Sequence, residues 1–133
     1  YKRQYKYIIL AYNGVKMDDK LKEALEFSNY RLTLNNQKQN LIQRMNTQLT
    51  IGYANAMFTS TLELINFVQH LIDKQVEQFI FLDDNKNPVL VTTLADFHLK
   101  LFSAYAEALN EFYNDYEKLK KQRNTKGLVG LNV

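Results

Sequence analysis

The feature that most constrains the fold is a repeat of alternating four- and three-residue steps between residues 21 and 49. Nine positions follow it, five of them apolar and four small or amide-bearing: Leu21, Leu25, Ser28, Leu32, Asn35, Gln39, Ile42, Asn46 and Leu49. Heptad spacing places all nine on one side of an α-helix, as in helices that pair along a seam. Leu34, Leu41 and Met45 form a second stripe beside it. Asp18 and Asp19 suit the positive end of the helix dipole. The sequence therefore predicts a long first helix.

The end of this first helix has two candidates. Gly52 is one, because glycine is a poor helix former. The other is Thr59–Ser60, because the run from Ser60 to Glu63 has the form of a capping box that starts a new helix. We favour the second candidate and expect the first helix to continue to about Met57. Five apolar residues at helical spacing then mark a second helix: Leu64, Ile65, Val68, Leu71 and Ile72.

The period changes after residue 78. The runs FIFL (79–82) and VLV (89–91) are β-prone, and the turn-rich segment DDNKNP lies between them. These features predict a β-hairpin at about residues 78–92. Thr92 or Thr93 then caps a third helix, whose apolar residues keep helical spacing from Leu94 to Leu119 and which ends before Gly127.

The predicted fold class is all-α: an antiparallel helical bundle of three main helices with a small β-hairpin between the second and third helices. A chain of 133 residues, 46% of them hydrophobic, is long enough for residues 17–133 to form one domain with a core. Residues 1–16 lack the helical period, and we expect them to be an N-terminal extension that precedes a native start at Met17. The alternative is that the segment from Tyr5 to Leu10 is a third strand beside the hairpin.

Catalytic and metal chemistry find little support in the sequence. The chain has no cysteine and two histidines, which excludes thiol catalysis and zinc–thiolate sites. Asp83, Asn85 and Asn87 match the start of a calcium loop, but Pro88 and Leu94 stand where that loop requires Gly and Glu. We therefore expect a protein that is not an enzyme and has no cofactor or metal.

The longest apolar run, residues 7–12, is too short to span a bilayer. The sequence thus predicts no membrane partner and a cytoplasmic location.

Polar residues on the heptad repeat indicate an interaction function. Amides on a helix seam commonly fix the register or number of partners at a cost in stability. The predicted contact has five residues at its centre: Leu32, Asn35, Gln39, Ile42 and Asn46. We expect a non-enzymatic assembly module that forms a homo-oligomer or binds a protein partner.

The alternative function is a small nucleic-acid-binding regulator. Residues 27–62 contain no acidic residue, and Arg31, Lys38 and Arg44 lie within them among many amides. Basic groups neutralise phosphate and amides hydrogen-bond to base edges. Three charges over this length are sparse, however, and the formal net charge of +3 is mild. We therefore favour protein pairing over nucleic acid.

Four stretches, taken together, carry a resemblance: ALEFSNYRLTLNNQKQNL (24–41), INFVQHLIDK (65–74), FLDDNKNPV (81–89) and ALNEFYNDYEKLKKQRN (108–124). They resemble uncharacterised small helical proteins encoded by large contractile-tailed phages of marine bacteria, over about residues 18–128. The resemblance implies a phage-related protein of the host cytoplasm or the virion, with a start that corresponds to Met17. It implies no activity and brings no catalytic residue.

Overall fold

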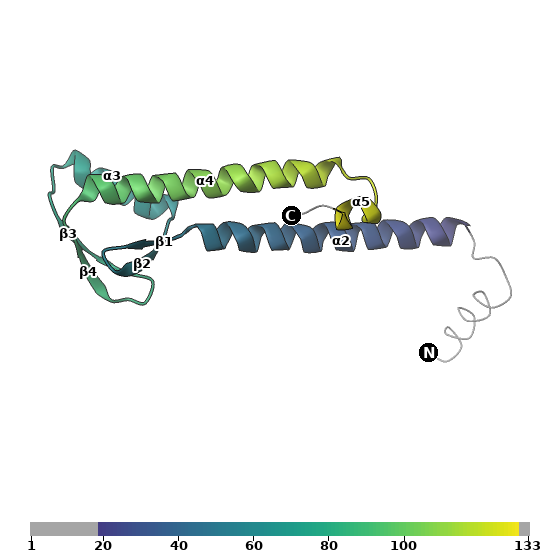
Figure 1. The fold of residues 1–133 in the computed structure, drawn as a ribbon, viewed down its shortest axis with the longest axis horizontal. Helices are drawn as coiled ribbons and strands as arrows, with labels where there is room; N and C mark the ends of the chain where they lie inside the picture. The colour runs from purple at the N-terminus through teal and green to yellow at the C-terminus, as the bar shows by residue number, and fades with distance from the viewer. Residues whose placement is uncertain (1–18, 131–133) are drawn as a thin grey trace.

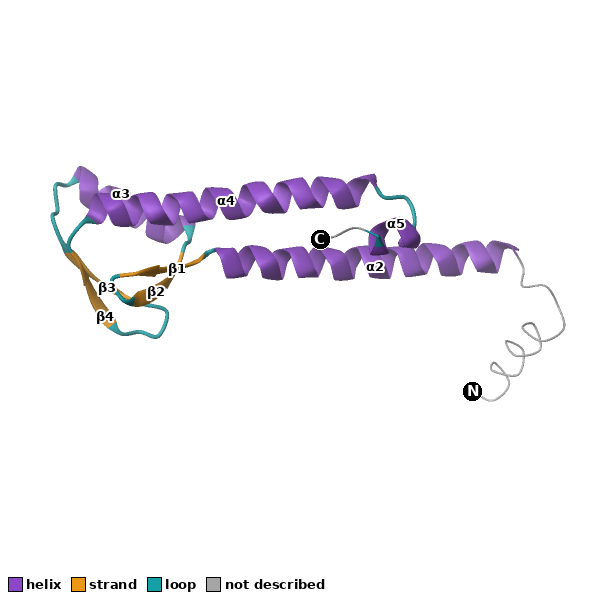
Figure 2. Ribbon diagram, viewed as in Figure 1, coloured by secondary structure: helices purple, strands orange, loops and turns teal. Residues whose placement is uncertain are grey.

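The computed structural model describes residues 19–130, and most of these residues are helical (Figures 1 and 2). The elements follow one another as α2 (Asp19–Gln48), β1 (Thr50–Tyr53), β2 (Ala56–Thr59), α3 (Leu62–Asp73), β3 (Phe79–Leu82), β4 (Pro88–Val91), α4 (Leu94–Lys121) and α5 (Thr125–Val129). None of the described helices has the length and apolarity needed to cross a membrane. The predicted extension, residues 1–16, lies outside the described residues, as do Met17 and Asp18.

A predominantly helical chain is confirmed, but the predicted count of three main helices is wrong, because four helices lie within residues 19–130. The extra helix is α5, a five-residue helix beyond the end of α4. Asn124 caps it by accepting a hydrogen bond from the amide of Gly127 at 2.7 Å. From the sequence, Gly127 predicts only that the preceding helix ends. In the structure Asn124 also caps a new helix, and Gly127 lies within it.

The predicted continuation of the first helix to Met57 is also wrong. α2 ends at Gln48, and an antiparallel hairpin of β1 and β2 follows, in which Ile51 is level with Phe58. Its two-residue turn is Ala54–Asn55, with φ of 52° and 62°. Positive φ at both turn residues is the geometry of a type I′ hairpin turn, whose twist matches the flanking strands.

The residues after this hairpin start α3 one position later than the predicted capping box. Thr61 is the N-cap, and its Oγ1 accepts a hydrogen bond from the Leu64 amide at 3.1 Å. Ser60 instead turns into the protein, where its fully buried hydroxyl donates to the backbone carbonyl of Leu101 at 2.5 Å. This bond ties the start of α3 to the N-terminal third of α4.

A second antiparallel hairpin pairs β3 with β4, with Phe81 level with Val89. Its turn is organised by Asp83, whose Oδ1 accepts from the amides of Asn85 at 2.9 Å and Asn87 at 2.8 Å. Side-chain acceptance of this kind replaces backbone pairing in a tight turn. Turn chemistry thus accounts for the residues that imitate a calcium loop.

Aromatic packing joins both hairpins to the start of α4. Phe97 is fully buried, and its ring lies 5.0 Å from the ring of Phe58 on β2 and 5.2 Å from that of Phe81 on β3. The hairpins also bond to each other, since the Asp84 carboxylate accepts from the amide and hydroxyl of Thr59 at 3.0 and 2.9 Å. The buried residues of this region come from both hairpins, α3 and α4, and we name them the hairpin-end core: Phe58, Ile65, Val68, Leu71, Phe81, Val91, Leu94, Phe97 and Leu101. A lone hairpin is marginal in water, and this packing stabilises both.

A smaller core lies at the other end of the α2–α4 pair. Leu41, Leu119 and Leu128 are buried against one another, with Tyr30 and Leu34 partly buried around them. These residues come from α2, α4 and α5, and we name the group the distal core. Within the described part of the chain, the buried apolar residues thus form two separate cores, one at the hairpins and one beneath α5.

The two long helices run antiparallel but are staggered (Figure 1). Gln48 bonds to Glu111 and Arg44 pairs with Asp115. Residue numbers therefore decrease along α2 in the direction in which they increase along α4. Continuing this register, the end of α4 comes level with about residue 38 of α2, and α5 packs on α2 beyond that point. The first turns of α2, residues 19–29, are exposed throughout, and part of this stretch lies beside residues 123–126.

Candidate interaction faces

The predicted contact residues share one face of α2, and that face points away from α4. Leu32 is 61% exposed. Asn35, Gln39 and Asn46 are exposed and Ile42 is half-buried. We name the positions at heptad spacing within the helix the α2 seam: Leu21, Leu25, Ser28, Leu32, Asn35, Gln39, Ile42 and Asn46.

The neighbouring stripe, not the seam, supplies the packing inside the chain. Leu41 is buried in the distal core, Leu34 packs against it, and Met45 is half-buried. Since each residue turns an α-helix by about 100°, the two stripes lie on different sides of α2. The seam is therefore left without a helical neighbour among the described residues that could cover its leucines.

Several exposed apolar side chains lie on the N-terminal turns of α2. Leu21 and Leu25 are about half exposed, and Phe27 is exposed as well. Single exposed apolar residues are ordinary on a protein surface, so the notable feature is that Leu21 and Leu25 share the seam with Leu32.

The three predicted nucleic-acid residues do not form one patch. Arg44 pairs with Asp115 at 3.6 Å, and the Lys38 ammonium lies 5.8 Å from the Tyr116 ring centroid. Their partners sit on opposite edges of the α2–α4 contact, because residues 38 and 44 are about 120° apart around the helix. Arg31 lies over the ring of Phe27 at 5.9 Å. Two of the three charges thus serve contacts between α2 and α4.

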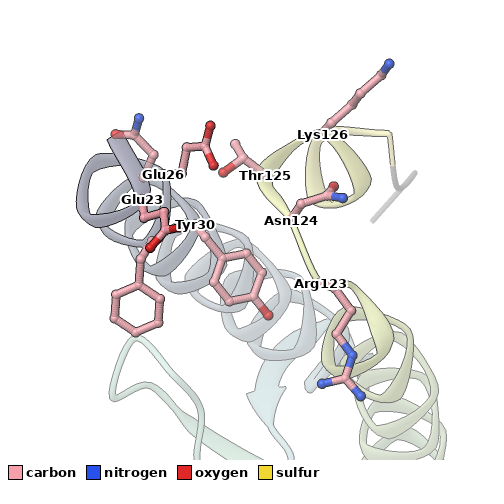
Figure 3. A pocket seen from close by; sticks show the side chains of 9 residues that line it. Glu23, Glu26, Tyr30, Arg123, Asn124, Thr125 and Lys126 are labelled. Carbon is pink, nitrogen blue, oxygen red and sulfur yellow. The ribbon is translucent and has the colours of Figure 1, made fainter. Parts of the chain in front are cut away.

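An open groove of about 690 Å³ lies between the free part of α2 and the segment that leads into α5 (Figure 3). Glu23 and Glu26 line the α2 side, and Arg123 and Thr125 line the other. Glu26 and Thr125 lie toward one another in Figure 3, whereas Lys126 extends away into solvent. The groove is open and carries both signs of charge, so it shows no selectivity for one class of small ligand.

The floor of this groove is a fixed structural contact. The hydroxyl of Tyr30 donates to the backbone carbonyl of Gln122 at 2.8 Å. It thereby satisfies a carbonyl at the C-terminal end of α4, where helix carbonyls lack intrahelical partners. Tyr30 is a structural residue that holds the α4–α5 connection on α2.

Among residues 19–130, two groups have a shifted pKa. Burial and the neighbouring Asp96 carboxylate raise the pKa of Tyr53, whose hydroxyl lies 3.2 Å from Asp96 Oδ2. The Glu117 carboxylate, which accepts from Lys120 at 3.2 Å, raises the pKa of that exposed lysine. Both shifts strengthen the protonation state that each group already has at neutral pH, so neither prepares a general acid or base. Residues 19–130 contain no cluster of three or more His, Cys, Asp or Glu that could hold a metal.

A second outward face, which the apolar periods of the sequence did not single out, runs along α4. It passes through Ala95, Leu99, Phe102, Ala106, Leu109 and Tyr113, which we name the α4 stripe. Its steps of four and three match a heptad, and its four large side chains are 37% to 62% exposed. The spacing is present in the sequence, but the longer apolar row from Leu94 to Leu119 on the same helix obscures it.

In comparisons with known proteins, no family model, no curated protein and no solved structure matches the chain. The function is therefore inferred from the geometry of these faces.

Proposed function

We propose that the protein is a non-enzymatic helical assembly module that associates with other copies of itself through the α2 seam. The observation that carries this proposal is the position of Leu21, Leu25 and Leu32, which lie exposed on a 30-residue helix whose opposite side makes the contacts within the chain. Burying these leucines against a partner gains the hydrophobic free energy that the single chain leaves unused.

The order of residues along the seam favours a parallel pair of α2 helices. In a parallel pair each heptad position meets its own counterpart. Leucines then meet leucines at Leu25 and Leu32, and amides meet amides at Asn35 and Gln39. Arg31 lies level with an amide, residue 36 of the other copy, so this cation does not face its like. Amide layers lower the stability of such a pair but disfavour shifted registers, in which an amide would face a leucine.

Association would also support the free end of α2. Short helical segments are marginal in water unless an amphipathic face packs on something. The side chains of residues 21–29 are exposed, so this part of the helix buries little apolar surface against the described residues. A second copy along the seam supplies that support.

The test is the oligomeric state as a function of concentration, measured by light scattering after size-exclusion chromatography. Replacing Asn35 with Leu removes an amide layer, and we expect the dissociation constant to fall about tenfold. Asn40→Leu is the matched control, because residue 40 is also an exposed amide but lies off the seam. An unchanged state for Asn35→Leu, or an equal effect of Asn40→Leu, contradicts the proposal.

Nucleic acid is a second candidate partner, supported by the absence of acidic residues in 27–62. It predicts an affinity for DNA or RNA that falls steeply with salt and is lost when Arg31, Lys38 and Arg44 become Ala. Fluorescence anisotropy with a labelled duplex and a labelled single strand measures this directly. A flat salt response removes the candidate. We also propose, from the resemblance described above, that the protein is phage-related.

A further inference from the structure

We propose that the α4 stripe is a second self-association surface, on which α4 of another copy packs antiparallel. This proposal adds a second surface to the proposed assembly function. It rests on that function in one respect, namely that the protein associates with itself. It concerns a different helix and does not use the α2 seam.

The first observation is the order of side-chain sizes along the stripe. In an antiparallel pair centred on residue 104, the positions face one another in three kinds of layer. Ala95 faces Tyr113, Leu99 faces Leu109 and Phe102 faces Ala106 of the other copy. Each small side chain thus lies opposite an aromatic ring, and the two leucines lie opposite each other. Alternation of large and small residues is what fills the space between two helices without voids.

The stripe is complementary to itself, which selects a second copy as the occupant. A two-fold contact places the same residues on both sides, so a face can be used this way only if its own layers match. A shift by one heptad would set Phe102 against Leu99 or Tyr113 against Phe102, and two large side chains would collide. The size pattern therefore specifies both the orientation and the register.

Charges at the borders of the stripe are compatible with this pairing. In the antiparallel arrangement Ser103 meets its own counterpart, and Asp96 comes level with Asn110. On the other border lies Tyr105, which is uncharged and packs against the hairpin-end core within its own chain. No two like charges are placed opposite each other at these positions, so they impose no electrostatic penalty.

The available area fits a dimer that dissociates on dilution. With residue surfaces of roughly 200 Å², the exposed parts of the four large side chains amount to about 400 Å² on each copy. Adding the alanines and the polar borders brings the total for two copies near the lower limit of about 1,200 Å² for a specific interface. We therefore expect a dissociation constant in the micromolar range.

The experiment uses charges placed on facing positions. Leu99→Lys and Leu109→Glu each put a charge opposite a leucine in their own homodimer, and each should weaken association by more than about tenfold. Mixed one to one, the two variants form a heterodimer. In it the introduced lysine faces the introduced glutamate, and Leu109 of one copy faces Leu99 of the other. One ion pair and one leucine pair thus replace the two charge–leucine contacts of each homodimer. Both substitutions fall on exposed positions of α4, and circular dichroism establishes that each variant is folded.

Sedimentation velocity on each variant, on the mixture and on Leu32→Lys separates the outcomes. Weakened association of both α4 variants with recovery in the mixture supports the proposal. Weakening without recovery overturns the proposed register. If the α4 variants associate like the unmodified protein while Leu32→Lys does not, the α4 surface is overturned and the α2 seam stands. A protein that stays monomeric at all concentrations overturns both.

Discussion

Truncating Leu128 should open one end of the molecule and leave the other intact. Leu128 is fully buried and is the buried side chain of α5, where it packs on Leu41 and Leu119. A Leu→Ala change in a core costs about 2–5 kcal/mol through lost transfer free energy and the cavity left behind. A five-residue helix has little other apolar contact to offset this cost, so Leu128→Ala should release α5 from α2.

The separation of the two cores makes the effect local. The hairpin-end core, with Phe97 at its centre, shares no buried residue with the distal core. A cost of about 2 kcal/mol corresponds to a roughly 30-fold increase in local opening. Hydrogen exchange should therefore accelerate at least that much at the amides of Leu128 and Gly130, which donate to the carbonyls of Asn124 and Lys126, and also along residues 30–38 of α2.

Hydrogen exchange followed by mass spectrometry resolves these segments in one measurement. Val129→Ala is the matched control, since Val129 is exposed in the same helix and its truncation should change the free energy of unfolding by less than about 0.5 kcal/mol. If Leu128→Ala accelerates exchange equally in β3, β4 and α3, the two cores unfold as one unit and the reasoning is refuted.

The contacts of three side chains can each be tested by one substitution. Ser60→Ala should lower the free energy of unfolding by about 1 kcal/mol in chemical denaturation, because the Leu101 carbonyl within α4 loses its hydroxyl donor. Asp83→Ala should cost about 1–3 kcal/mol in the same assay by leaving two hairpin amides without their acceptor. The raised pKa of Tyr53 means that the folded state holds that proton more tightly than the unfolded chain, so stability falls as pH rises above about 10, and Tyr53→Phe should make this fall shallower in thermal melts at pH values from about 8 to about 11.

The long helices could be predicted because their apolar periods extend over many turns. The periods could not show which of two adjacent stripes of α2 packs inside the chain. The seam and the row of Leu34, Leu41 and Met45 are both regularly spaced. The second row packs inside the chain because Leu119 of α4 and Leu128 of α5 bury Leu41. Tertiary partners thus decided an orientation that spacing alone left undetermined.

The hairpin of β1 and β2 could not be predicted for a different reason. Its turn is Ala54–Asn55, which lacks the glycine that normally signals a type I′ turn. Gly52, the residue that looked like a breaker, lies within β1 level with Met57. Local turn chemistry was therefore misleading here, and the hairpin depends on its packing against Phe97.

Two outward faces on one molecule have a consequence for the shape of any assembly. A single two-fold contact closes after two copies, since each partner's face is then used up. Here the α2 seam and the α4 stripe lie on different helices, so one copy can bind a different neighbour through each. The neighbour bound through the α2 seam still has its own α4 stripe exposed, and the neighbour bound through the α4 stripe still has its α2 seam exposed. If the two-fold axes of the two contacts intersect at right angles, four copies close into a tetramer; if they do not intersect, the copies form an open chain whose length is set by concentration. In either case, blocking one face alone would stop growth at pairs.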